Sequence, residues 1–239
     1  MNAEPISVMA SRTACLTGER FDLRAIRQAL AGLRHNMDRV NYFLDNDQVD
    51  LSRQSVDQIV QAYGMLDHYV SIELRLLALG QSREVLALNH CVLFGQENTD
   101  NLDYRKAFRA NEKHFYRVGS SGIGDMLEWY SRHRNLTVWR QAAGIYLNTV
   151  GPPQLFLEGN HRTGVLLANY VLARANKSPL VLDAQLAPDW FRLTEKIRKR
   201  RGSIFDPKYW FRSLDIELAD FIQANVNECY LRSDSGNRF

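Results

Sequence analysis

The sequence predicts an all-α protein, a helical bundle built around one buried central helix. Apolar residues recur at three- and four-residue steps along most of the chain, whereas the alternation of a half-buried strand is weak everywhere. Residues 163–175 are apolar nearly all round, which is typical of a helix in the middle of a bundle. The length of 239 residues and the apolar share of 45% suit one domain with a helical extension.

The first part of the chain, residues 21–84, is predicted to be this N-terminal helical extension. Residues 1–20 show no periodicity, and we expect them to be poorly ordered. Helical spacing then begins. A second helix is expected to start after Ser52, a preferred N-cap residue, and to end at Gly80.

The larger part, residues 85–232, is predicted to form the main domain. Residues 104–116 have the spacing of a helix rather than of a hairpin, and Pro152 and Pro153 cannot continue the helix before them. The tail, residues 233–239, is expected to be disordered. The other helices are expected over residues 85–94, 126–133, 138–149, 163–175, 186–200 and 207–231.

Composition and charge exclude several classes of protein. The formal net charge is only +3, and the basic residues 196–201 are expected to be a solvated helix end, so we expect no nucleic acid partner. Three widely spaced cysteines give no zinc-ligand spacing and fit a reducing compartment. No signal-peptide core and no membrane-length apolar stretch is found, so we expect a cytoplasmic protein that binds no membrane.

The connection before the central helix contains the residues that point to chemistry. Gly159 lets a ligand approach the backbone, and the first N–H groups of the next helix favour phosphate. Arg162 can pair with phosphate oxygens, and Glu158 can hold Mg²⁺ beside them. An ordinary helix–helix connection explains the same residues, with Gly159 in the turn, Asn160 as N-cap, and Glu158 and His161 in solvent.

This connection resembles the signature loop of the Fic family, in which His-x-Phe-x-Asp/Glu-Gly-Asn-Gly/Lys-Arg-x-x-Arg precedes a buried helix. The matching positions are Phe156, Glu158, Gly159, Asn160 and Arg162. Residues 88–94 look like an off-register version of an upstream family helix, and Arg105 and Trp129 fit family positions as well. The resemblance covers about residues 85–215.

The resemblance implies a Fic fold that transfers AMP from ATP, or another phosphate-linked group, to a hydroxyl of a target protein. Glu158 would then bind Mg²⁺, and Phe156 would pack inward and fix the loop. The nucleotide phosphates would lie against the glycine of the loop and the start of the central helix, at Gly159, Asn160, His161, Arg162, Thr163 and Gly164.

Several positions depart from the family pattern. Gln154 stands where the family has its catalytic His, and an amide has no usable basicity, so AMP transfer is expected to be weak or absent. His161 is either a displaced base, a donor to the nucleotide, or an exposed histidine without a function. Val165 replaces the second Arg, and we find no self-inhibitory motif that would pair with it. A helix over residues 104–116 would also replace the flap that docks the target as an added strand.

Three functions stay open from the sequence. The chain is a transferase with altered chemistry, a pseudoenzyme that still binds a nucleotide or a partner, or a helical protein-interaction module. Intact phosphate-binding positions favour the first function, and the replacement of the catalytic His by Gln154 favours the second. The oligomeric state is also open, with a homodimer as one option.

Overall fold

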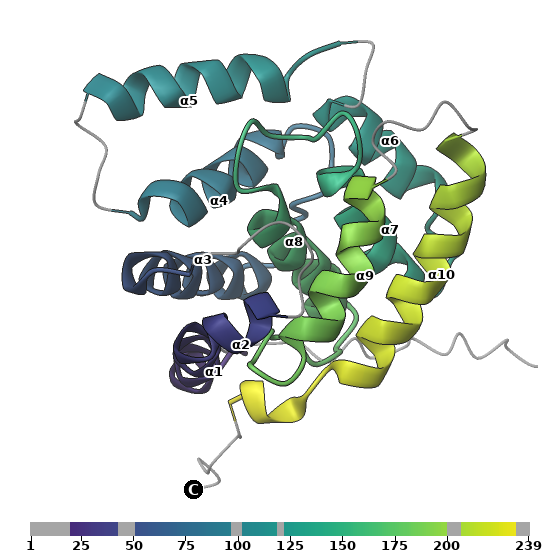
Figure 1. The fold of residues 1–239 in the computed structure, drawn as a ribbon. Helices are drawn as coiled ribbons and strands as arrows, with labels where there is room; N and C mark the ends of the chain where they lie inside the picture. Colours follow the sequence, from purple (N-terminus) through teal and green to yellow (C-terminus); the bar gives the residue numbers. More distant parts are fainter. Residues whose placement is uncertain (1–19, 43–50, 97–101, 119–121, 200–206, 233–239) are drawn as a thin grey trace, which may run out of the picture.

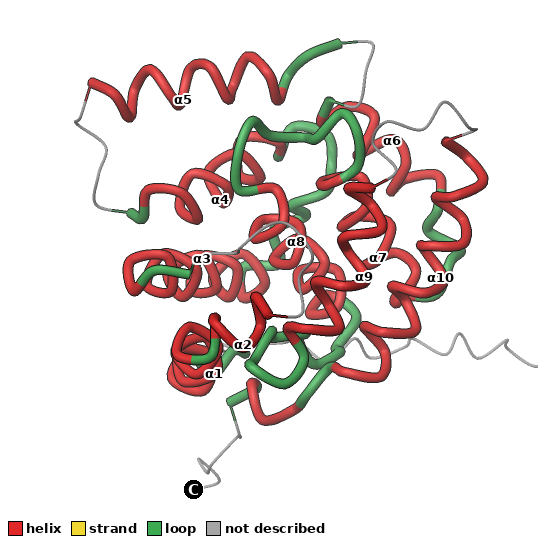
Figure 2. Tube along the Cα trace, in the orientation of Figure 1, coloured by secondary structure: helices red, strands yellow, loops and turns green. Residues whose placement is uncertain are grey.

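The computed structural model describes residues 20–42, 51–96, 102–118, 122–199 and 207–232. Within these ranges the chain forms ten α-helices and one short 3₁₀ helix, and the only strand-like pairing is an isolated bridge between Phe21 and Leu231. The all-α prediction is therefore confirmed, as Figure 2 shows by the absence of strands from the described trace. Residues 1–19 and 233–239, for which we predict poor order, lie outside these ranges.

The helices follow one another with short connections. Their bounds are α1 (Leu23–His35), α2 (Met37–Tyr42), α3 (Arg53–Ser71), α4 (Ser82–Phe94), α5 (Leu102–Phe115), α6 (Ile123–Arg132), α7 (Val138–Val150), α8 (Asn160–Arg174), α9 (Ala187–Lys199), α10 (Pro207–Asn225) and the 3₁₀ helix η1 (Glu228–Tyr230). The predicted cap of α3 is correct, because the Ser52 hydroxyl accepts a hydrogen bond from the Ser55 N–H at 3.0 Å.

Helix α8 is the centre of the bundle, as predicted, and it packs against α7, α3 and α4 (Figure 1). It begins at Asn160, one turn earlier than the apolar pattern indicates. Gly164 allows a close approach to α7, because a Cβ at this position would lie only 2.9 Å from Cδ2 of Tyr146. The start of α8 is thus fixed against a buried aromatic ring.

The predicted end of the second helix at Gly80 is wrong, since α3 stops at Ser71. The hydroxyl of Tyr170 in α8 accepts a hydrogen bond from the Leu76 N–H at 2.9 Å and donates one to the Leu74 carbonyl at 2.6 Å. These two bonds satisfy main-chain groups that a continued helix would have paired internally, and Leu76 is fully buried in the resulting turn.

Helix α5 confirms the prediction of a helix over residues 104–116. It lies beside α4, with Asn111 and Phe115 buried. The described residues therefore form no strand-like flap in this region.

The two ends of the described chain meet at α3. The Asp67 carboxylate accepts hydrogen bonds from the N–H groups of Arg20 at 2.6 Å and Phe21 at 3.0 Å. The Asp22 N–H donates to the Tyr230 carbonyl at 2.8 Å. The last helix is shorter than the predicted range 207–231, because α10 ends at Asn225 and η1 follows it.

None of the described helices combines the length and the apolar character that crossing a membrane requires.

Candidate functional site

The loop between α7 and α8 contains a position that only glycine fits. Gly159 has a φ of 76°, in the left-handed region that side chains rarely adopt. A Cβ at this position would also lie 2.9 Å from Asn89 Nδ2 and 3.0 Å from Leu93 Cδ2. Gly159 therefore lets the loop run directly against α4 and turn into α8 without a side chain in the way.

A polar network of buried amides holds this loop. Asn89 of α4 donates through Nδ2 to the Glu158 carbonyl at 3.0 Å and to the Thr163 hydroxyl at 2.9 Å. Asn111 of α5 donates to Asn89 Oδ1 at 2.8 Å and accepts from the Leu157 N–H at 3.0 Å. We call these two amides the asparagine pair. It ties α4, α5, the loop and the first turn of α8 together.

Asn160 is the first residue of α8, and not its N-cap as the simple connection would have it. Its Oδ1 accepts from the Phe156 N–H at 2.8 Å, and its Nδ2 donates to the Phe156 carbonyl at 2.9 Å. The side chain is only 4% exposed, which places both of its polar atoms inside the loop. Asn160 therefore acts on the shape of the loop.

The earlier half of the loop is held by α5 and the turn that follows it. His114 Nε2 lies 3.0 Å from the Gln154 carbonyl, and Arg117 Nη2 donates to the same oxygen at 2.7 Å. Phe156 is buried, as predicted, and stacks on Phe115 with ring centroids 5.2 Å apart. The main chain of Gln154 is thus fixed by two basic side chains, while its own side chain is half-buried.

Glu158 and Arg162 line one polar cavity of about 290 Å³, together with Ser55 and Gln58 of α3. Glu158 is exposed, whereas Arg162 is half-buried and donates through Nη1 to the Val92 carbonyl at 3.2 Å. Burial lowers the pKa of Arg162, and the nearby Glu158 carboxylate acts in the opposite direction. An arginine keeps its charge at any physiological pH, so this cavity has a partly desolvated cation on its wall.

His161 is held from the other side, by α7. The Tyr146 hydroxyl lies 2.7 Å from His161 Nδ1, and the Tyr146 ring meets Trp190 edge-on with centroids 4.8 Å apart. Tyr146 is fully buried, but His161 itself is exposed. The two predicted catalytic positions, Gln154 and His161, are therefore fixed by different helices.

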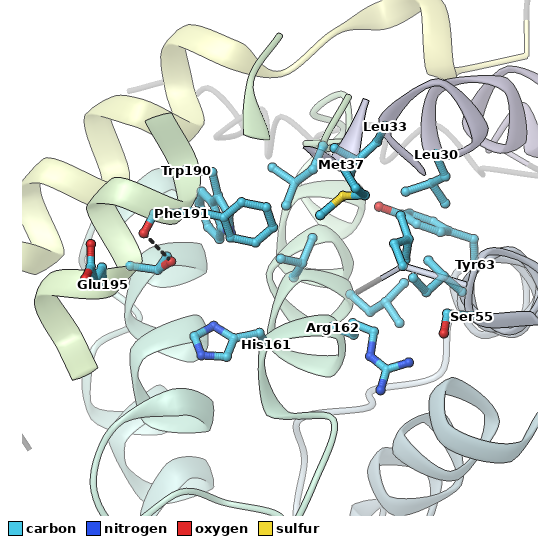
Figure 3. A pocket seen from close by; sticks show the side chains of 16 residues that line it. Leu30, Leu33, Met37, Ser55, Tyr63, His161, Arg162, Trp190, Phe191 and Glu195 are labelled. Atoms are coloured by element: carbon cyan, nitrogen blue, oxygen red, sulfur yellow. Dashed lines mark hydrogen bonds between the residues drawn. The ribbon is translucent and has the colours of Figure 1, made fainter. Parts of the chain in front are cut away.

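A larger, mostly apolar cavity of about 410 Å³ adjoins the same turn of α8 (Figure 3). We call it the apolar cavity. Arg162 and Ser55 line both this cavity and the polar one, and Val165 and His161 line only the apolar one. In Figure 3, Arg162 and His161 lie on the side opposite Met37 and Leu33. Its volume falls in the range of about 300–1,000 Å³ that small-molecule sites occupy.

Magnesium fits this site only under one condition. The described residues contain no group of three or more His, Cys, Asp or Glu side chains that could hold a metal by themselves. Glu158 supplies one carboxylate at the polar cavity. Mg²⁺ commonly uses one or two carboxylates and completes its shell with phosphate oxygens and water. The residues therefore fit a magnesium ion that arrives together with a phosphate ligand.

Two of the predicted phosphate-binding residues face the protein. The Thr163 side chain is fully buried and its hydroxyl accepts from Asn89. Gly164 is buried against Tyr146. Sequence reasoning also missed the asparagine pair, Arg117 and Tyr146. The only local signal for the pair is an amide at a core-facing step of an apolar helix, as at Asn111.

No protein-family model and no curated protein matches the sequence. Among solved structures, the fold is similar to that of a Fic domain containing signaling protein from Bacteroides thetaiotaomicron VPI-5482. The sequence identity is 12%, the TM-score is 0.46, and the matched region covers 86% of this chain and 89% of the other. A likeness of this size assigns no activity and no ligand to this chain.

Proposed function

We propose that this chain is a Fic-type protein that binds a phosphate ligand, and that its classical AMP transfer is weak or absent. The observation that carries the proposal is the position of Arg162 in the first turn of α8, half-buried on the wall of the polar cavity beside Glu158. First-turn N–H groups and the helix dipole favour an anion at this place, and a guanidinium adds paired hydrogen bonds to phosphate oxygens.

The ligand we propose is a nucleotide such as ATP, with Mg²⁺ bound between its phosphates and Glu158. The sequence resemblance implies this ligand, and the fit of a phosphate-borne magnesium at the polar cavity supports it. Arg162 is the main phosphate-binding residue in this proposal. Asn160 and Thr163 support the site by fixing the loop, because their side-chain atoms pair with Phe156 and Asn89.

Weak transfer follows from the residue at position 154. Attack by a protein hydroxyl on phosphorus requires a base near neutral pH, and the loss of such a base typically costs about 10²–10⁴ in rate. The Gln154 amide cannot accept the proton. His161 is the one candidate substitute among the predicted site residues, and its hydrogen bond to Tyr146 orients its ring at the apolar cavity.

A calorimetric titration with ATP and Mg²⁺ tests the binding step. The wild-type protein should bind, and Arg162→Ala should weaken binding at least tenfold. Arg132→Ala is the matched control, because Arg132 is an exposed arginine of α6 that pairs with Glu128. Equal binding by all three proteins, or by none, would contradict the proposed phosphate site.

Transfer is tested separately, with labelled ATP and candidate protein targets. We expect little labelling by the wild type and more by Gln154→His, since the variant restores an imidazole at the family position. Strong labelling by the wild type that is lost in His161→Ala would instead make His161 the working base. If neither protein labels a target although ATP binds, the chain is a nucleotide-binding pseudoenzyme.

A further inference from the structure

The apolar cavity is a feature that a phosphate site does not explain. Its volume is about 410 Å³, and it lies between the N-terminal helices and α8 and α9. Most of its wall is hydrocarbon, and the contributing side chains include Leu30, Leu33, Met37, Ile59, Val165 and Phe191. Such a wall offers van der Waals contact to a ligand but few hydrogen-bonding partners.

Two polar side chains in this wall are engaged within the fold. The Tyr63 hydroxyl donates to the Leu180 carbonyl at 3.3 Å and accepts from Asn169 Nδ2 at 2.8 Å. The Thr194 hydroxyl donates to the Phe191 carbonyl at 3.2 Å. A ribose or a base edge placed against this wall would therefore exchange water for few new hydrogen bonds, which disfavours a polar occupant.

Charge is concentrated at one end of the cavity. Arg162 and His161 lie next to each other on α8, and Arg162 has lost part of its hydration. Glu195, the acidic residue of the lining, lies at the opposite end from Arg162 in Figure 3. The cavity thus combines a hydrocarbon wall with a cationic end, and this combination matches a molecule with an anionic head and an apolar chain.

We propose that the apolar cavity binds a single-chain amphiphile with a phosphate head. The head would pair with the Arg162 guanidinium beside His161, and the chain would lie between Met37 and Leu33 on one side and Trp190 and Phe191 on the other. The proposal shares Arg162 with the proposed nucleotide site but does not require a nucleotide. Because Arg162 lines both cavities, the amphiphile and ATP should compete.

The test uses decyl phosphate below its micelle concentration, titrated calorimetrically into the full chain. Val165→Trp fills the cavity from α8, and Val118→Trp makes the same change at a site that is 97% exposed. We expect the wild type and Val118→Trp to bind equally, and Val165→Trp and Arg162→Ala to bind at least tenfold more weakly. Decanol and inorganic phosphate should each bind at least tenfold more weakly than decyl phosphate. A thermal melt of each variant shows that it is folded, and Val165→Phe replaces Val165→Trp if the latter unfolds.

The outcomes separate this inference from the proposed function. ATP binding without decyl phosphate binding overturns the amphiphile and leaves the nucleotide site intact. Decyl phosphate binding without ATP binding does the reverse. Binding that Val165→Trp leaves unchanged would place the chain outside the cavity, and inorganic phosphate binding as tight as that of decyl phosphate would remove any role for the apolar wall. Either result overturns the inference.

Discussion

The two sides of the first turn of α8 differ in how their polar side chains are used. On the side of α4 and α5, the asparagine pair and Asn160 are buried, and the atoms of their amides pair with the loop and with one another. On the side of α3 and α9, Arg162 and His161 line cavities. The comparison assigns loop shape to neutral amides and ligand contact to basic side chains.

The largest effect is expected from Gly159→Val, which strikes the loop side. The left-handed backbone costs about 1–3 kcal/mol for a residue with a side chain, and the new Cβ would lie 2.9 Å from Asn89 Nδ2. We expect a loss of about 3 kcal/mol in the free energy of unfolding, measured by urea titration. The control is Gly32→Ala in α1, where a new Cβ has nothing within 4 Å and should stabilise the helix. Similar losses in both variants would contradict the geometric argument.

Removing one member of the asparagine pair should cost somewhat less. Asn89→Ala leaves the Glu158 carbonyl, the Thr163 hydroxyl and the Asn111 amide short of a partner. We expect a loss of about 2 kcal/mol in unfolding free energy, because an orphaned buried polar group costs about 1–3 kcal/mol. ATP binding should weaken along with stability.

Asn148→Ala is the matched control for this change. Its amide donates only to the Gly144 carbonyl of its own helix, at 2.7 Å, and it is half-buried. A loss in this variant as large as in Asn89→Ala would mean that the network adds nothing beyond an ordinary amide.

His90 makes the loop side sensitive to pH. It is 4% exposed, its Nδ1 has no partner among the described residues, and it packs against Phe108 with ring centroids 4.1 Å apart. Burial lowers its pKa from 6.5 to about 4. The unfolded chain therefore takes up a proton at higher pH than the folded one, so stability is lost as the pH falls from 6.5 towards 4.

The loss due to His90 should be about 1 kcal/mol between pH 7 and pH 5.5. It is measured as the difference between the wild type and His90→Leu in urea titrations across this range. His35→Leu, at an exposed histidine of α1, is the control and should follow the wild type. Parallel curves for the wild type and His90→Leu would disprove the role of His90.

The smallest stability effect should come from the cavity side. Tyr146→Phe removes the hydroxyl that lies 2.7 Å from His161 Nδ1 and should cost about 1 kcal/mol or less. Tyr116→Phe removes a hydroxyl on the surface, 3.2 Å from Ser82 Oγ, and serves as control. Decyl phosphate affinity should drop more than stability in Tyr146→Phe, because His161 loses its orientation. Unchanged affinity would mean that His161 has no part in the site.

The sequence predicted the features that depend on neighbouring residues. The central helix follows from an apolar run, and the special role of Gly159 follows from its place between a loop and that helix. The end of α3 did not follow, because it depends on Tyr170, which lies 94 residues beyond Leu76. A helical pattern cannot reveal a competing partner that far along the chain.

The site was predictable to the same extent. Arg162 could be picked out beside the glycine, but the direction of Asn160 could not, since its amide turns back to Phe156. The asparagine pair joins residues that are 22 positions apart on two helices. The apolar cavity arises only where the N-terminal helices meet α8 and α9, and none of these segments shows it alone.

The junction of the two chain ends has a consequence for the order of local opening. Asp67 and η1 tie down the segment that leads into α1, and α1 supplies Leu30 and Leu33 to the cavity wall. Fraying at the junction would therefore loosen one wall of the cavity. By reciprocity, an occupant of the cavity should slow amide hydrogen exchange in η1, a helix that contributes no residue to the cavity wall.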